Sequence, residues 1–164
     1  MRLNVMEAGQ GPALLLLHGL FGSARNWGGV QKALAQHYRV IAMDLRNHGG
    51  SPHAAGMDYA AQAADVAETL AALGVRSATI LGHSMGGKAA MMLALTRPDV
   101  VERLIIADIA PRPYPPALRA VVAALQAVPL NPGLTRQEAD QALQGAVPEA
   151  PIRSFLLQNL RFET

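Results

Sequence analysis

The serine at position 84 stands in a pattern that can carry out nucleophilic chemistry. The run from Gly82 to Gly86 matches G-x-S-x-G, with the apolar segment Ala78–Leu81 before it and the helical pattern Gly86–Thr96 after it. A strand, a sharp turn and a helix in this order hold a serine at a strained bend, and the flanking glycines avoid clashes there. The pattern therefore predicts that Ser84 is the nucleophile of an acyl-transfer reaction that passes through an acyl-enzyme.

Acyl transfer also requires hydrogen-bond donors for the negative oxygen that forms on the substrate carbonyl. The amide of Met85 is one expected donor, because it opens a helix whose positive dipole end faces the serine. A second donor is expected in the loop after an earlier strand. Residues 18–22, with the sequence HGLFG, follow the apolar run Ala13–Leu17. We expect the amide of Leu20 to be this donor, with Phe21 next.

The same residues also approach a phosphate-binding loop. The run from Gly82 to Lys88 fits G-x-x-x-x-G-K, and Asp108 ends an apolar segment as a magnesium-binding aspartate would. The next position of that motif needs a Ser or Thr hydroxyl for Mg²⁺, and the chain has Ala89. A nucleotide hydrolase, which would leave residues 18–19 unexplained, is therefore the weaker alternative.

Short apolar runs alternate with amphipathic helical patterns, which is typical of a parallel sheet with crossover helices. Asp58 can cap one helix at its start, and Gly74 can end it. We expect strands at Leu3–Glu7 (an edge), Ala13–Leu17, Arg39–Met43, Ala78–Leu81 and Arg103–Ala107, and further helices at Ser23–Gln36 and Gly86–Thr96. In the helix Ser23–Gln36, an apolar face is expected from Trp27, Val30 and Leu34.

The pattern changes after Asp108. Residues 110–116 contain four prolines, which neither a helix nor a central strand tolerates, and only helical patterns follow. One of these opens with a capping box, Thr135 to Glu138, and another carries an apolar stripe of Ile152, Phe155, Leu156 and Leu160. We expect residues 1–111 to form the N-terminal part of an α/β core, and residues 112–164 to begin a helical cap, with the last strands and helices of the fold absent.

Composition excludes several classes of function. The 164 residues are 51% hydrophobic and 16% charged, which suits a buried core, and the net charge of +2 includes no basic run that could bind nucleic acid. The absence of cysteine removes disulfides, thiolate metal sites and cysteine nucleophiles. No apolar run is long enough to cross a bilayer, so we expect a soluble cytoplasmic protein.

Three segments together resemble a known family. Residues 18–23, 44–52 and 82–88, continued by residues 108–111, are similar to the YbfF-type esterases of the α/β-hydrolase superfamily. The resemblance implies an α/β-hydrolase fold and the hydrolysis of short acyl esters and acyl thioesters, with no metal or organic cofactor. It also implies that the helical segment is a cap that selects the acyl chain, and that Phe21 and His83 border the substrate.

The resemblance also suggests roles for two aspartates that end strands. Asp108 is the candidate acid of the catalytic triad, and the alternative is a capping role before the proline-rich segment. Asp44 is expected to organise a turn by pairing with Arg46 or His48.

The general base is missing from this pattern. The fold takes its triad in the order Ser, Asp or Glu, His, but all five histidines precede Ser84: His18, His37, His48, His53 and His83. We expect His18 and His48 to make structural hydrogen bonds, His37 and His53 to be solvated, and His83 to point away from the reacting face. The base is therefore expected beyond Thr164, in a protein of which this chain is a truncated, inactive part.

Two further expectations follow from this incomplete pattern. The segment Arg103–Ala107 would be an unpaired, apolar edge strand that favours self-association. A non-catalytic binding module that uses the pocket of the cap is the alternative to an enzyme.

Overall fold

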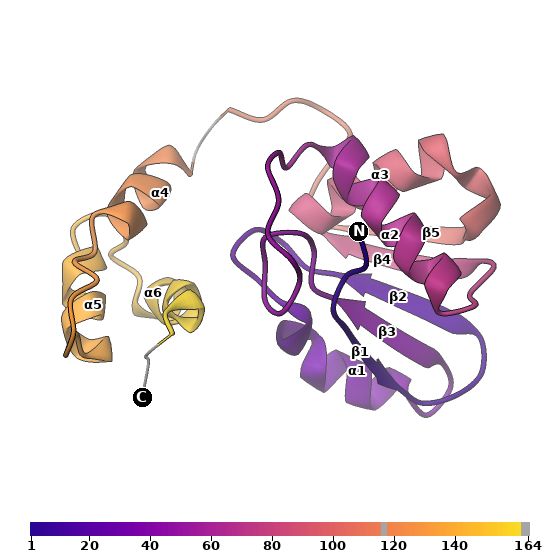
Figure 1. Cartoon of the computed structure of the whole chain (residues 1–164), viewed down its shortest axis with the longest axis horizontal. Helices are drawn as coiled ribbons and strands as arrows, with labels where there is room; N and C mark the ends of the chain where they lie inside the picture. The colour runs from indigo at the N-terminus through magenta and orange to yellow at the C-terminus, as the bar shows by residue number, and fades with distance from the viewer. Residues whose placement is uncertain (116–117, 162–164) are drawn as a thin grey trace. The chain divides into compact units, whose positions relative to one another are not determined.

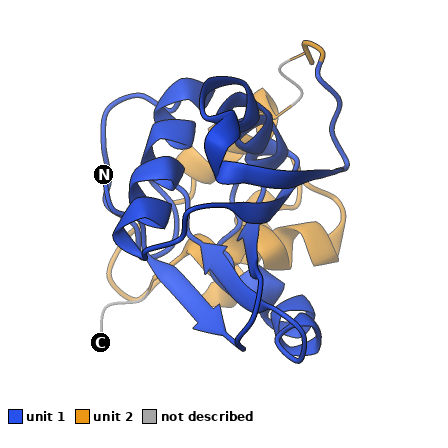
Figure 2. Cartoon of the chain, turned by 90° about the vertical axis from the view of Figure 1, so that its right-hand side faces the viewer, with its two compact units in different colours: residues 1–111 blue, residues 112–164 orange. Residues whose placement is uncertain are grey.

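The computed structural model describes residues 1–115 and 118–161. The chain divides into two compact units, Met1–Pro111 and Arg112–Thr164 (Figure 2). The division falls within the proline-rich segment, of which Pro116 lies outside the described residues. Within the described residues, no helix is both long enough and apolar enough to span a membrane.

The first unit is built on a five-stranded sheet (Figure 1). Its edge strand β1 runs antiparallel to β3, and all other neighbouring strands are parallel. Across the sheet the strands are β1 (Val5–Ala8), β3 (Arg39–Met43), β2 (Ala13–Leu17), β4 (Ala78–His83) and β5 (Val101–Ala107). The five predicted strands are therefore present with different bounds at three of them: the edge strand expected at Leu3–Glu7 lies at Val5–Ala8, β4 extends to His83, and β5 begins at Val101.

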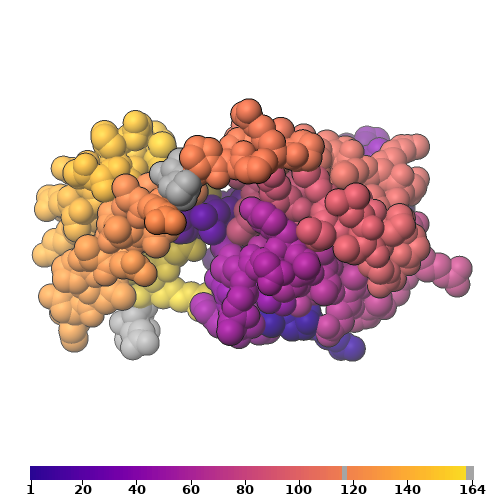
Figure 3. Space-filling view, turned by 90° about the horizontal axis from the view of Figure 1, so that it is seen from above, coloured from indigo at the N-terminus to yellow at the C-terminus, as the bar shows by residue number. Residues whose placement is uncertain are grey.

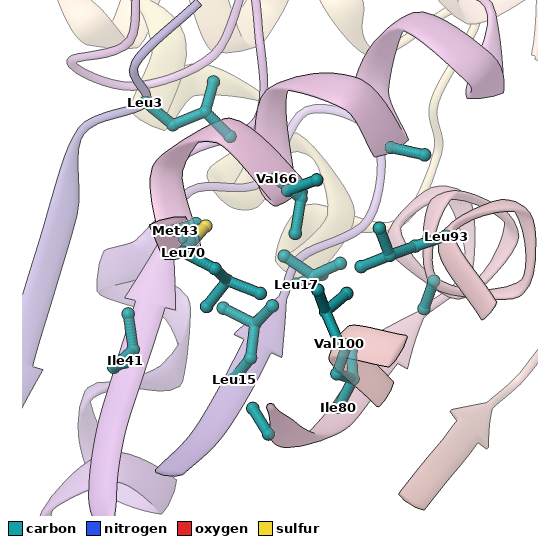
Figure 4. Close-up of a cluster of buried hydrophobic side chains, with 14 of the residues drawn as sticks. Leu3, Leu15, Leu17, Ile41, Met43, Val66, Leu70, Ile80, Leu93 and Val100 are labelled. Carbon is teal, nitrogen blue, oxygen red and sulfur yellow. The ribbon is translucent and has the colours of Figure 1, made fainter. Parts of the chain in front are cut away.

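Alternation along the strands sends side chains to two cores, one on each face of the sheet. Leu15, Leu17 and Ile80 pack under α2 (Tyr59–Ala72) and α3 (Met85–Thr96) in the larger core (Figure 4). Leu14, Leu16, Val40 and Ala42 point to the other face, which α1 (Gly28–Leu34) and the preceding 3₁₀ turn η1 (Ala24–Trp27) cover. Strands buried on both faces explain why the sequence reads there as unbroken apolar runs.

The helix predicted at Ser23–Gln36 is in fact two short pieces, η1 and α1. The glycine pair at residues 28–29 has low helix propensity and stands at their junction. Trp27 and Leu34 reach the core as expected, but the side chain of Val30 is 41% exposed, so the predicted apolar face is wrong at this position. The caps of α2 are confirmed: Asp58 Oδ1 accepts from the Ala61 amide at 2.8 Å, and Gly74 follows the helix with a φ of +69°.

The second unit has a small core of its own, made by Val128, Ala139, Leu143 and Leu157. Its elements are α4 (Arg119–Gln126), α5 (Arg136–Leu143), α6 (Ala150–Leu156) and the 3₁₀ turn η3 (Leu157–Asn159), drawn in orange to yellow in Figure 3. The capping box from Thr135 to Glu138 is confirmed at the start of α5. The apolar stripe predicted for α6 is only partly buried: Leu156 is buried, whereas Ile152 and Phe155 are exposed.

Candidate active site

Ser84 is the single residue between β4 and α3. Its backbone has a φ of +50° and a ψ of −115°, a conformation that costs free energy in a non-glycine residue and that is concentrated at functional sites. Its amide donates to the carbonyl of Ala107 at 3.0 Å, and its carbonyl accepts from the Lys88 amide at 3.1 Å. The bend is therefore held both by β5 and by the first turn of α3. Within residues 1–115 and 118–161, the Ser84 hydroxyl has no hydrogen-bond partner, and the side chain is partly exposed.

The bend of residues 82–86 around Ser84, called the elbow below, needs its glycines because the backbone packs closely there. A Cβ atom on Gly86 would lie 2.6 Å from the carbonyl oxygen of Leu17, at the end of β2. A Cβ on Gly82 would overlap the carbonyl of Gly86 itself. Neither position can take a side chain unless the backbone moves, which is the physical reason for the G-x-S-x-G spacing.

The elbow excludes the phosphate-loop alternative. A phosphate-binding loop needs several residues between strand and helix whose amides surround the anion. Here β4 ends at His83 and α3 begins at Met85, so Lys88 already lies inside the helix. The nucleotide-hydrolase hypothesis is therefore wrong. In the described part of the chain, no group of three His, Asp or Glu side chains could hold a metal ion.

The loop that was predicted to supply the second oxyanion donor lies against the elbow. A Cβ atom on Gly19 would be 3.3 Å from Ser84 Cβ and 2.9 Å from Nδ1 of His83. The Gly22 amide closes the loop as a turn by donating to the Gly19 carbonyl at 3.0 Å, and Phe21 adopts a φ of +63°. The structure thus brings the two predicted motifs together.

Neither of the two predicted donor amides has a hydrogen-bond acceptor among the described residues. In the part of the chain that the structure describes, the Leu20 amide makes no hydrogen bond. The Met85 amide belongs to the first turn of α3, where amides have no acceptor within the helix.

His83 and Asp108 lie close to each other beside the elbow. The distance from His83 Nε2 to Asp108 Oδ2 is 3.7 Å, which is too long for a hydrogen bond, and the two side chains are 44% and 86% exposed. The imidazole of His83 lies against Gly19. The prediction that it points away from the reacting face is therefore wrong. By the alternation of β4, His83 shares the sheet face of Leu81.

His18 and His48 have structural roles, as predicted. The Leu45 amide donates to Nε2 of His18 at 3.0 Å, so the ring proton lies on Nδ1, which donates to the Gly19 carbonyl at 2.8 Å. Burial lowers the pKa of His18 to about 4, which keeps the ring neutral. Nδ1 of His48 lies 2.8 Å from the Arg46 carbonyl. The side chains of His37 and His53 are exposed, as expected.

Asp44 organises a turn, but not with the predicted partners. Its carboxylate accepts from the amides of Ala24 at 2.6 Å and Gly50 at 2.8 Å, and from Asn4 Nδ2 at 2.7 Å. Burial alone would raise the pKa of this carboxyl group, but these hydrogen bonds outweigh burial and hold the pKa below its ordinary value.

Arg46 pairs instead with a residue that the sequence did not single out. Its Nε donates to Asp65 on α2 at 2.6 Å, and both side chains are buried. The signal in the sequence was Asp65 itself, a carboxylate on the apolar side of a helix, where a charge is rarely left without a partner. The predicted pairing of Asp44 with Arg46 or His48 is wrong.

Comparison with known proteins shows the family of this chain. The family model for the alpha/beta hydrolase fold matches residues 12–163. The chain belongs to the α/β-hydrolase family. It is 46% identical over 157 residues to the mouse (Mus musculus) sn-1-specific diacylglycerol lipase ABHD11, covering 91% of this chain and 51% of the mouse protein. It is 39% identical to the esterase YbfF of Escherichia coli, covering 89% and 58% of the two chains.

A solved structure has a similar fold. The structure of a marine microorganism esterase superposes with a TM-score of 0.93 at 37% identity, covering 99% of this chain and 65% of the esterase. The chain spans about half the length of the curated relatives it matches. The predicted fold class and the resemblance to esterases are confirmed.

Proposed function

We propose that the protein to which this α/β-hydrolase chain belongs cleaves carboxylic esters, including acyl thioesters, through an acyl-enzyme on Ser84. The observation that carries the proposal is the strained bend at Ser84 with the loop of residues 18–22 packed against it. The names of the relatives, an esterase and a diacylglycerol lipase, support ester cleavage.

The chemistry assigns a role to each part of the site. Ser84 Oγ attacks the substrate carbonyl, and the amides of Leu20 and Met85 donate to the oxygen as it becomes negative. The dipole of α3 favours the same charge. A histidine takes the hydroxyl proton of Ser84 during the attack and gives it to the leaving group, which then departs. Water that loses a proton to the same histidine next attacks the acyl-enzyme and releases the acid. Phe21 and His83 border the substrate.

The proton relay requires an acid and a base. We assign the acid to Asp108, which follows β5 directly, and the base to a histidine outside residues 1–164. The second assignment is supported by the contacts of the histidines in the chain. His18 and His48 are bound in structural hydrogen bonds. His83 comes before Ser84 in the chain, whereas the triad order of the fold puts the histidine after the serine and the acid. The helical unit of residues 112–164 is assigned to a cap that shapes the acyl pocket.

The test replaces Ser84 with alanine in the complete protein. The Ser84→Ala variant is expected to lose hydrolysis of p-nitrophenyl butyrate by about 10⁴-fold or more, because the hydroxyl that forms the acyl-enzyme is removed. Labelling by a fluorophosphonate probe is expected to vanish with it. Ser77→Ala is the matched control, since Ser77 is an exposed serine just before β4.

The result also separates an enzyme from a binding module. A complete protein that binds ester analogues equally well with and without Ser84, and that is never labelled, would be the non-catalytic module. Labelling that persists in Ser84→Ala would assign the nucleophile to another residue.

A further inference from the structure

We propose that His18 is a positioning residue that orients the Leu20 amide toward the oxyanion by holding the Gly19–Leu20 peptide in one orientation. The inference rests on the proposed function, because it concerns the donor that this function requires. The buried ring of His18 would then orient a donor of the site in addition to packing in the core.

The argument begins with the geometry of one peptide unit. The carbonyl of Gly19 and the amide of Leu20 belong to the same planar, trans peptide, so they point in opposite directions. Two donors converge on the Gly19 oxygen: Nδ1 of His18 at 2.8 Å and the Gly22 amide at 3.0 Å. Whatever fixes that oxygen therefore also fixes the direction of the Leu20 N–H.

Glycine at position 19 makes such a restraint necessary. A Cβ atom there would lie 2.9 Å from His83 Nδ1 and 3.3 Å from Ser84 Cβ, so a side chain would have to displace the His83 ring and would crowd the nucleophile. Glycine, however, has the widest choice of backbone conformations, and its peptide can rotate at little cost. A rotated peptide would turn a carbonyl oxygen, instead of an amide, toward the developing negative charge.

The ring of His18 is itself firmly anchored. Its exposed fraction is 2%, its Nε2 accepts from the Leu45 amide at 3.0 Å, and the ring of His48 lies 5.0 Å away. The neighbouring Asp44 accepts from the Ala24 amide at 2.6 Å, just after the loop. Asp44 and Leu45, the two residues after β3, therefore hold the two ends of the loop of residues 18–22, called the oxyanion loop below. Leu45 acts through His18, at the end nearer Ser84.

The test separates the two nitrogen atoms of the ring. In His18→Asn, the side-chain amide can occupy the place of Nδ1 and donate to Gly19, while the bond from Leu45 is lost. In His18→Gln, the longer side chain can accept from Leu45 near the place of Nε2, while the bond to Gly19 is lost. Each variant keeps one bond, so a purely structural role predicts similar losses in both.

Positioning predicts a split between the variants of the complete protein. We expect kcat for p-nitrophenyl butyrate to fall about 10²-fold in His18→Gln with KM changed less than about threefold, as when an oxyanion donor is lost. His18→Asn is expected to stay within about fivefold of the unsubstituted kcat. Equal losses of kcat in the two variants, in proportion to their losses in melting temperature, would overturn the proposal.

A second measurement does not depend on how the variants fold. With ¹⁵N-labelled histidine in the unsubstituted protein, NMR is expected to find the His18 proton on Nδ1, before and after a phosphonate binds Ser84. A proton on Nε2 would overturn the positioning role. If the phosphonate never binds Ser84, the proposed function has failed instead, and the two failures are thereby distinguished.

Discussion

At the residue scale, the buried histidine that begins the oxyanion loop makes stability depend on pH. The pKa of His18 is about 4 in the folded chain, against 6.5 for a free imidazole, because burial opposes the charged ring. The unfolded chain therefore binds a proton more readily between these values. The contribution of neutral His18 is complete above pH 6.5 and is lost as the pH falls toward 4. The two pKa values correspond to at most about 3 kcal/mol.

Urea unfolding of the chain at pH 7 and at pH 5 measures this effect. We expect the unfolding free energy to fall by about 2 kcal/mol between these pH values, and the fall to be largely absent in His18→Asn. The charged and titratable neighbours of the ring are His48 and Asp44, and both remain in the control. Because the pKa of Asp44 is lowered, its own loss comes at more acidic pH. An unchanged pH dependence in the variant would contradict the assignment.

Which residues could be predicted depended on how far apart their partners lie in the sequence. The elbow at Ser84 could be predicted because it is a local motif. Its glycines are needed because they lie close to the backbone of the same turn and to the end of β2. The Asp44–Ala24 and Arg46–Asp65 contacts were missed because about twenty residues separate the two members of each pair, and the sequence around Asp44 and Arg46 does not identify the partner.

At the element scale, the strands were predictable because burial on both faces leaves unbroken apolar runs. The first helix was not, since spacing alone does not show that a glycine pair will divide it into η1 and α1. The side of the sheet on which His83 lies was also missed. It follows from the register of β4, which becomes visible only when Leu81 is placed in the core with α1.

The capping box of α5 gives a prediction at this scale. The Thr135 hydroxyl oxygen accepts from the Glu138 amide at 3.2 Å, and the Glu138 carboxylate accepts from the Thr135 amide at 2.8 Å. Thr135→Ala removes the first of these bonds and is expected to destabilise the second unit by about 1 kcal/mol. Amide hydrogen exchange should quicken in α5 (Arg136–Leu143).

The control for this prediction lies in the same unit. Ser154 is exposed in α6, and Ser154→Ala is expected to change stability by only a few tenths of a kcal/mol, since alanine favours the helix. Exchange in α5 that is equally fast in both variants, or unchanged in Thr135→Ala, would mean that the cap does not stabilise the helix.

At the scale of the whole molecule, the exposed edge of the sheet gives a prediction for how copies of the chain behave in solution. Among the described strands, β5 has a partner only on the side of β4, and its apolar side chains Leu104 and Ile105 are 38% and 47% exposed. An apolar edge with unpaired backbone groups is a template for pairing with another chain. We therefore expect residues 1–164 to associate at micromolar concentration in analytical ultracentrifugation.

A charge at this edge should prevent the association. Ile105→Lys places a solvated ammonium group on the edge strand, which opposes close pairing with another chain, and is expected to shift the sedimentation profile toward monomer. Val30→Lys is the matched control, because Val30 is a similarly exposed apolar side chain, at 41%, on α1 rather than on the sheet edge. If both variants dissociate alike, general surface charge rather than the β5 edge controls association, and a monomeric unsubstituted chain would remove the basis for the prediction altogether.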